Sequence, residues 1–165
     1  MNHNMNKNIY LKILTKQRPF AYAQVSGSSE YPGLGGLVKF YSSPSGVLVM
    51  AEIYGLPTQT GPCNGKIFGF HIHEGSACTG DEEDPFKDTG MHYNPGKCQH
   101  PYHAGDLPPL FSSNGNAWMV VLSQRLIPEE LIGHTVIIHS SPDDFTTQPS
   151  GNSGKKIACG SIVKF

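Results

Sequence analysis

Hydrophobic and polar residues alternate in short runs along most of the chain. Residues 20–26 and 37–42 show the two-residue period of a strand that buries one face, and a cluster of turn-forming residues at 32–36 separates them. Residues 128–131 have the character of a single helical turn. Eight closely spaced strands predict an all-β antiparallel sandwich or barrel. The other expected strands are 47–55, 66–74, 107–112, 116–123, 134–140 and 157–164.

Three stretches lack this strand pattern. Residues 1–18 are rich in Asn and Lys, and we expect a tail or loosely attached segment there, which leaves 19–165 as one domain. Residues 75–105 and 141–155 form two loops of a length that is usually functional or disordered in a compact domain. Both loops carry polar side chains suited to metal binding, next to the ends of strands.

Composition supports this fold class and excludes several partners. The 165 residues include 19 Gly and 13 Pro, and 15% are charged, against roughly 25% charged in an average domain. This balance favours short strands and loops over a helical bundle. A formal net charge of -1 gives no basic footprint for nucleic acid or an anionic membrane surface. Since no apolar run approaches the roughly 18 residues that span a bilayer, we expect neither nucleic acid nor membrane as a partner.

The cysteines and the N-terminal residues point to different cellular compartments. No two of them form a Cys-x-x-Cys pair, so one or two disulfides suit them better than a zinc knuckle. Disulfides indicate an oxidising compartment, whereas the first 18 residues contain no signal-peptide core. The expected location is cytoplasmic if this N-terminus is native, and periplasmic or extracellular if a signal was removed. The four cysteines are Cys63, Cys78, Cys98 and Cys159.

The expected strand at 66–74 places two histidines on one face. His71 and His73 are two residues apart, so their side chains point the same way with roots about 6–7 Å apart, which suits two ligands of one ion. Phe70 and Ile72 take the opposite face and belong to the core. The imidazoles then stand on the outer face of the barrel, where the two long loops are available to exclude water. For this pair alone, a polar half-exposed face without a metal stays open as an alternative.

A second cluster completes a different ligand set. Three imidazoles and one carboxylate within fifteen positions form a tetrahedral set that suits zinc. An all-imidazole set with an open position suits copper, which changes its redox state. A solvated loop that happens to be rich in histidine is the alternative, and the gathering of six histidines at two loops and two strand ends makes it a poor one. The zinc-type set comprises His92, His100, His103 and Asp106.

Several segments together resemble the copper–zinc superoxide dismutase family, with Ser76-Ala77-Cys78 and residues 106–110 closest to its bacterial branch. The resemblance covers residues 20–165. It implies a Greek-key β-sandwich or barrel with two long metal-site loops, copper and zinc as cofactors, and conversion of superoxide to oxygen and hydrogen peroxide. A homodimer is compatible with it. The segments are Gly69-Phe70-His71-Ile72-His73-Glu74, Gly105-Asp106-Leu107, Ile137-Ile138-His139 and Ile157-Ala158-Cys159-Gly160.

The resemblance also implies a role for individual residues. The ring of His92 would bridge both ions and carry a proton during catalysis, and Asp143 would tie His71 to His100. A disulfide would join Cys78 to Cys159. The implied copper ligands are His71, His73, His92 and His139, and the implied zinc ligands are His92, His100, His103 and Asp106.

Three departures from the family pattern bear on activity. Lys156 stands where the family has an arginine, so the positive charge is kept but the planar two-pronged donor is lost, and we expect activity that is lowered but present. Only two residues separate His100 from His103, which predicts a tight loop and strained zinc geometry. Residues 81–84 are four acids, which would repel superoxide near the channel, although a solvated loop tip is the favoured interpretation.

Four residues and two other functions complete the expectations. We expect Cys63 and Cys98 to be free thiols, or Cys98 to have an external partner, and His134 to be structural or exposed. His3, close to a free amino terminus, has the spacing to bind Cu(II), but a disordered tail without a role is the favoured alternative. The main competing function is a non-enzymatic copper- and zinc-binding domain on the same fold. A purely structural sandwich would leave the placement of the histidines unexplained.

Overall fold

The structure is a computed structural model that describes residues 9–61 and 66–165. The described residues form mostly β-structure, as the alternating pattern predicts. Three short helical segments accompany the strands: α1 (Ile9–Lys16), the 3-10 helix η1 (Lys87–Thr89) and α2 (Pro128–Leu131). The strands are β1 (Ala21–Gly27), β2 (Gly35–Ser43), β3 (Gly46–Tyr54), β4 (Ile67–Phe68), β5 (Phe70–His73), β6 (Leu110–Phe111), β7 (Ala117–Ser123), β8 (Thr135–His139) and β9 (Lys156–Lys164).

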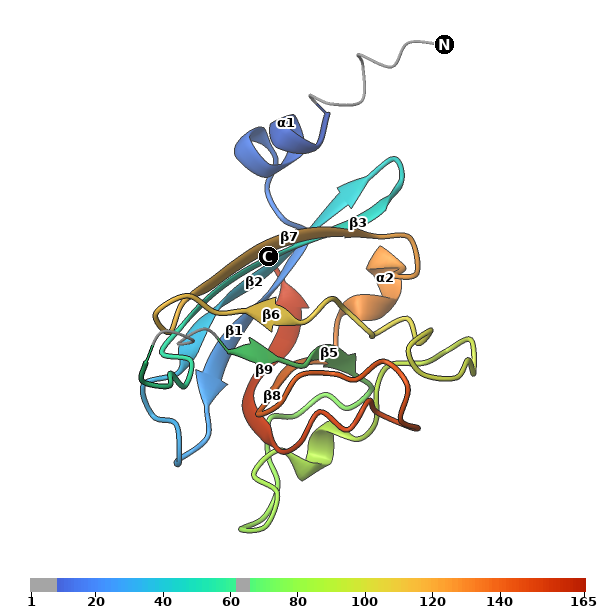
Figure 1. The fold of residues 1–165 in the computed structure, drawn as a ribbon. Helices are drawn as coiled ribbons and strands as arrows, with labels where there is room; N and C mark the ends of the chain where they lie inside the picture. Colours follow the sequence, from blue (N-terminus) through green and yellow to red (C-terminus); the bar gives the residue numbers. More distant parts are fainter. Residues whose placement is uncertain (1–8, 62–65) are drawn as a thin grey trace.

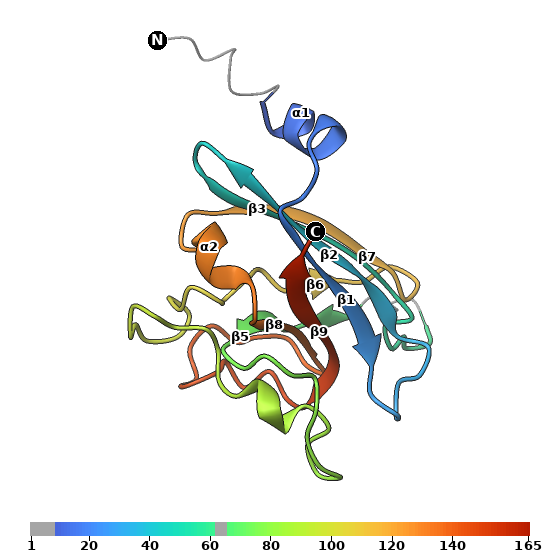
Figure 2. The same cartoon turned by 180° about the vertical axis from the view of Figure 1, so that it is seen from behind.

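Seven strands form one curled antiparallel sheet in the order β5-β8-β9-β1-β2-β3-β7, and β4 pairs with β6 in a second, small sheet (Figures 1 and 2). The chain crosses from β3 towards the opposite edge at β5, and crosses again from β7 to β8. These crossings place strands from both halves of the sequence side by side. The fold is therefore the antiparallel half-barrel of the expected class.

The strand expected at 66–74 is interrupted, which gives nine strands instead of eight. Gly69 lies between β4 and β5, where its N–H donates to Ser141 O at 2.8 Å and its carbonyl accepts from His139 N–H at 2.8 Å. A Cβ at this position would lie 2.9 Å from Cβ of Ser153, so the loop that follows β8 packs directly against the backbone here. The break thus brings the second long loop onto the strand that carries His71 and His73.

The core fills the concave side of the sheet. Inward positions alternate along the strands, as in Val38 and Phe40 of β2, and the same alternation puts Phe70 and Ile72 of β5 in this core. Each buried aliphatic or aromatic side chain of this kind contributes roughly 1.5–3 kcal/mol to folding. Because Phe70 and Ile72 are anchored, the intervening His71 faces the other side of β5.

Helix α1 differs from the expected loosely attached tail. Its apolar residues recur with helical spacing, and Ile13 is only 2% exposed because it packs on Tyr41 and Leu48, on the outer face of β2 and β3. Figure 1 shows α1 above this face. Residues around the contact are Ile9, Tyr10, Leu14, Met50, Val120 and Leu122. His3 lies outside the described residues, and the boundary at 18/19 stays a prediction.

The two long loops lie together over β5 and β8 (Figures 1 and 2). A disulfide joins Cys78 of the first loop to Cys159 of β9, with a Cα–Cα distance of 5.6 Å. Phe86 and Ile137 pack with this disulfide in a small separate cluster. The pairing implied by the family resemblance is thus present, and it fixes the first loop to the sheet. None of the described helices is long and apolar enough to span a membrane.

Candidate metal centre

His71 and His73 are held on the face of β5 that the loops cover. Across the β5–β8 pair, His71 lies opposite Ile137 and His73 opposite Thr135. His92 of the first loop forms an isolated bridge with His73, and Asp106, which directly follows that loop, forms one with His71. His71 is 0% and His73 2% exposed. Their burial excludes the half-exposed polar face, and the two loops exclude water as expected.

Four imidazoles converge at this covered face. Their ligand-type nitrogens all lie within 4.8 Å of one another, and all four residues are buried. Nε2 of His73 is 3.3 Å from Nε2 of His139, and the ring centroids of His71 and His92 are 3.9 Å apart. The first group, as we call it, consists of His71, His73, His92 and His139.

Three rings of the first group are oriented by hydrogen bonds at the nitrogen that points away from the group. Nε2 of His71 contacts Asp143 Oδ2 at 2.7 Å. Nδ1 of His73 contacts the carbonyl of Gly90 at 2.9 Å, and Nδ1 of His139 contacts that of Gly154 at 3.3 Å. Such outer partners fix the tautomer and aim the other nitrogen at a metal. The sequence gives no signal for the two glycine carbonyls.

Two nitrogens inside the group are unsatisfied. His71 Nδ1 and His92 Nε2 are buried and find no hydrogen-bond partner among the described residues. Leaving a buried polar atom unpaired costs about 1–3 kcal/mol. A soft, imidazole-binding cation such as copper would satisfy both atoms, so the donor set fits the expected metal.

The second group combines three imidazoles with one carboxylate. Asp106 Oδ1 lies 2.7 Å from His92 Nδ1 and 3.3 Å from His103 Nδ1. Its Oδ2 lies 3.1 Å from His100 Nδ1, yet that nitrogen makes no hydrogen bond with the described residues. Atoms so close without bonding geometry indicate ligands arranged about a common centre. This nitrogen-and-oxygen set fits zinc. Its members are His92, His100, His103 and Asp106.

His92 belongs to both groups. Its Nδ1 lies in the second group, 2.7 Å from Asp106 Oδ1, whereas its unpaired Nε2 lies on the other side of the ring. The family resemblance implies such a shared ring, and its bridging of two ions stays a prediction.

Asp143 connects the two groups from outside. One oxygen contacts His71 and the other contacts His100 Nε2 at 2.9 Å, while the N–H of Phe145 donates to Oδ1 at 2.7 Å. Burial alone would raise the pKa of Asp143, but the hydrogen bonds from His71, Phe145 and His100 outweigh it and lower the pKa to about 2. Asp143 is therefore a carboxylate at neutral pH.

Gly151 leaves the room that this carboxylate needs. Its φ is +68°, and a Cβ there would lie 2.0 Å from Asp143 Oδ1 and 2.7 Å from His100 Nε2. Any larger residue would displace Asp143 and would also be strained at this φ.

Burial favours the neutral form of three histidines of the first group, His71, His73 and His139. Desolvation, followed by repulsion from the neighbouring rings, lowers the pKa of His73 well below its usual value and that of His139 to about 3. Desolvation also lowers the pKa of His71, although its hydrogen bond to Asp143 opposes the shift. Neutral imidazole is the form that binds a metal.

The tight loop between His100 and His103 is supported from two sides. Gln148 pairs with the backbone of His100: its Oε1 accepts from the N–H at 3.0 Å and its Nε2 donates to the carbonyl at 2.7 Å. The guanidinium of Arg125 donates to Pro101 O at 3.0 Å and to Asp106 O at 2.6 Å. The sequence gives no signal for these contacts, because Gln148 and Arg125 are distant in the chain. Strain at a bound zinc stays a prediction.

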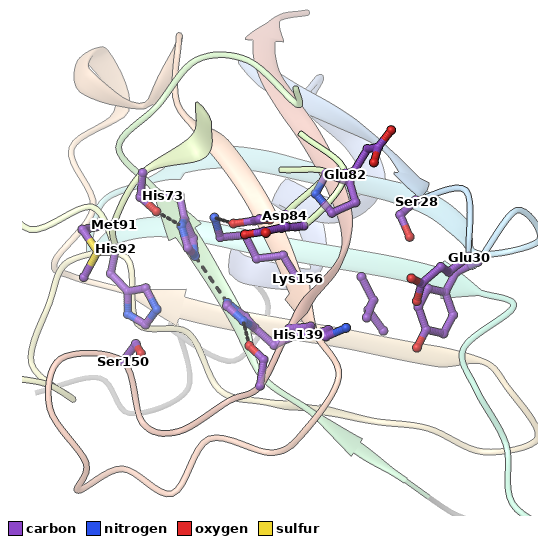
Figure 3. A pocket seen from close by; sticks show the side chains of 17 residues that line it. Ser28, Glu30, His73, Glu82, Asp84, Met91, His92, His139, Ser150 and Lys156 are labelled. Carbon is purple, nitrogen blue, oxygen red and sulfur yellow. Dashed lines mark hydrogen bonds and ion pairs between the residues drawn. The ribbon is translucent and has the colours of Figure 1, made fainter. Parts of the chain in front are cut away.

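A pocket of about 570 Å³ opens beside the first group (Figure 3). His73, His92 and His139 are among the residues that line it. The four acids at 81–84, called the acidic segment below, contribute Glu82, Glu83 and Asp84 to the lining. This segment therefore lies at the pocket instead of forming only a solvated loop tip. Lys156 Nζ lies within this pocket, 2.8 Å from Asp84 Oδ2 and 3.0 Å from the carbonyl of Phe86.

His134 and Cys98 belong to neither group. His134 is partly exposed, contacts the carbonyl of Glu74 at 2.8 Å and stacks on Tyr93 at 4.4 Å between ring centroids. This fits the structural role expected for it. Cys98 is an exposed free thiol, and Cys63 lies outside the described residues.

The chain resembles known proteins over most of its length. A family model described as copper/zinc superoxide dismutase matches residues 34–162. Cu-Zn superoxide dismutase 2 of Aquifex aeolicus is 34% identical over 144 residues, which cover 77% of this chain and 78% of that protein. The Cu-Zn superoxide dismutase of Photobacterium leiognathi is 40% identical over 108 residues, covering 57% and 62%.

Solved structures agree with this likeness. Cu/Zn superoxide dismutase from Brucella abortus superposes with a TM-score of 0.71 at 25% identity, over 86% of this chain and 98% of that chain. A SOD-like protein from Bacillus subtilis gives a TM-score of 0.71 at 27% identity, over 85% and 96%. Because the family model spans most of the sequence and bacterial relatives share over 30% identity, the chain belongs to the copper/zinc superoxide dismutase family.

Proposed function

We propose that the first group holds the copper and the second group the zinc of a working superoxide dismutase. The observation that carries this proposal is the pair of buried four-residue groups that share His92, with unsatisfied nitrogens pointing into them. When bound, copper exchanges one electron with each of two superoxide ions in turn, giving oxygen and hydrogen peroxide, while zinc keeps one oxidation state.

His92 is the catalytic group of this chain that moves a proton. Its Nε2 is buried beside the pocket and has no partner among the described residues, so it is the atom at which a proton is held and passed to the departing peroxide. Its Nδ1, close to Asp106, keeps the ring in place. The second proton comes from water in the pocket.

Lys156 is the residue that attracts the anion. Its ammonium lies in the pocket that contains His73 and His139, and it stands at the position of the family arginine. A single ammonium positions a small anion less well than a planar guanidinium. We therefore infer that the enzyme is active but less efficient than a form with arginine here.

The competing function, a metal-binding domain without catalysis, has little support. What supports catalysis is that the four imidazoles of the first group are all buried and lie close enough together to share one ion. The contrary observations are Lys156 and the short loop between His100 and His103, neither of which removes a ligand.

The test is superoxide decay by copper- and zinc-loaded protein, compared with His139→Ala. Loss of this ring should lower the rate of superoxide decay by more than roughly 100-fold. That is the upper end of the loss in activity when a group that only hydrogen-bonds to a metal ligand is removed. His134→Ala is the matched control, because it removes a histidine outside both groups. If the wild-type chain binds both metals tightly without accelerating decay, it is the non-enzymatic domain.

The location and assembly of the enzyme are further parts of this proposal. The Cys78–Cys159 disulfide suits an oxidising compartment, which supports export over a cytoplasmic location. The enzyme unit is residues 19–165 with α1 packed on its sheet, and a homodimer is the assembly to test by light scattering.

A further inference from the structure

The ammonium at the pocket is not free. Lys156 begins β9 and lies opposite His139 of β8, which directs its side chain towards the pocket beside the first group. There Asp84 Oδ2 accepts from Nζ at 2.8 Å (Figure 3). The Phe86 carbonyl also accepts from Nζ, at 3.0 Å. The side chains are 15% exposed for Lys156 and 38% for Asp84. The pair thus lies partly shielded from water at the pocket wall.

The other charged groups that line the pocket do not make up for the ammonium of Lys156, which is paired with Asp84. Four carboxylates line it, from Glu30, Glu82, Glu83 and Asp84, against the two ammonium groups of Lys155 and Lys156. An approaching anion therefore meets more negative than positive groups. A cation that is paired with a carboxylate presents a dipole, whose attraction for an anion falls off faster with distance than that of a single charge.

We propose that Asp84 is a positioning residue that weakens the capture of anions by this pocket, acting through its ion pair with Lys156. The inference rests on the proposed function, since it concerns the substrate of the same site. It assigns to the acidic segment a defined effect: one of its carboxylates sets how strongly the pocket attracts a small anion.

Asn in place of Asp84 separates this role from a structural one. The N–H of Phe86 donates to Asp84 Oδ1 at 3.0 Å, and an Asn side chain retains that acceptor. The Phe86 carbonyl continues to hold the ammonium of Lys156. Asp84→Asn therefore removes the charge while the loop and the lysine keep their anchors.

The experiment measures azide binding to the copper- and zinc-loaded protein by the absorption band that azide gives on Cu(II). Azide is a small monovalent anion and stands in for superoxide. We expect Asp84→Asn to bind azide roughly two- to fivefold more tightly, the size of an exposed ion-pair contribution. Asp84→Glu should restore weak binding. Glu83→Gln is the matched control, since it removes a charge of the same pocket wall without removing the carboxylate that pairs with Lys156.

A double-mutant cycle identifies the route of the effect. In a Lys156→Met background, Asp84→Asn should change azide affinity no more than Glu83→Gln does. The proposal would be overturned if Asp84→Asn changed the azide affinity equally with and without Lys156. It would also be overturned if Asp84→Asn left the azide affinity unchanged, or if the copper of the wild-type protein gave no azide band. Superoxide decay is measured in parallel: no decay with the azide shift present contradicts the proposed function alone.

Discussion

Asp143 Oδ2 lies 2.7 Å from Nε2 of His71, with both side chains almost completely buried. The other oxygen of the same carboxylate contacts His100, which belongs to the second group. One acid thereby orients a ring in each of the two metal-type groups. With both ions bound, the geometry at one would consequently be coupled to the presence of the other.

Replacing Asp143 should weaken both sites together. In Asp143→Asn, one amide cannot accept from both rings, so at least one of His71 and His100 loses its orientation. We expect affinities for zinc and copper to fall roughly 10–100-fold, measured by competition with a chromophoric chelator. Asp144→Asn is the control, because its Oδ1 still accepts from the backbone of the same loop. Unchanged affinities in Asp143→Asn would contradict the coupling.

Restoring the family arginine should speed the reaction. Lys156→Arg adds a planar donor that reaches the Phe86 carbonyl and an anion at once, so kcat/KM for superoxide should rise roughly two- to tenfold. Pulse radiolysis measures this rate directly. Lys155→Arg, an exposed neighbour, should leave it nearly unchanged. A rate that stays the same or falls in Lys156→Arg would remove Lys156 from anion capture.

Removing the disulfide should cost much of the folding stability. The bond closes a loop across 81 positions of sequence, for which the chain-entropy model gives about 4–5 kcal/mol. We expect the double variant Cys78→Ser, Cys159→Ser to lose most of this free energy of unfolding in urea denaturation of the metal-free protein. Cys98→Ser, which alters an exposed free thiol, should have no effect. A loss below about 1 kcal/mol would show that packing of Phe86 and Ile137 already fixes the loop.

Helix α1 should contribute to stability without touching the metal groups. Ile13→Asp places a charge in the contact with Tyr41 and Leu48, so the free energy of unfolding should fall by at least the roughly 1.5–3 kcal/mol of a buried aliphatic side chain. Metal stoichiometry should stay unchanged. Leu11→Asp, on the exposed side of the same helix, should be nearly neutral. Equal stability of wild type and Ile13→Asp would mean that the helix is loosely attached.

Local spacing in the sequence indicates which histidines share a face, whereas contacts between distant parts of the chain cannot be predicted in this way. The spacing of His71 and His73 determines that both rings share a face, because the period of a strand is fixed. The pairing of Lys156 with Asp84 could not be predicted, since 72 positions separate them and only the folded loop brings them together. The interruption of the strand at Gly69 could not be predicted either. The local sequence fits one continuous strand, and the interruption depends on the distant loop that packs on this glycine.

Helix α1 could not be predicted either, because it also depends on contacts with distant residues. Its apolar side chains form too short a stretch to indicate a stable helix by themselves. What stabilises it is the outward-facing pair Tyr41 and Leu48, which the alternation of β2 and β3 presents on the convex side of the sheet.

The position of α1 also restricts how this protein can assemble. The helix occupies the apolar patch that the convex surface of β2 and β3 would otherwise offer to another molecule. A second subunit that approached from this direction would meet the solvent-facing side of the helix, where Leu11 is exposed, and not the strands themselves. Pairing of two copies directly through the convex strands β2 and β3 would therefore require α1 to leave its contact with Tyr41 and Leu48.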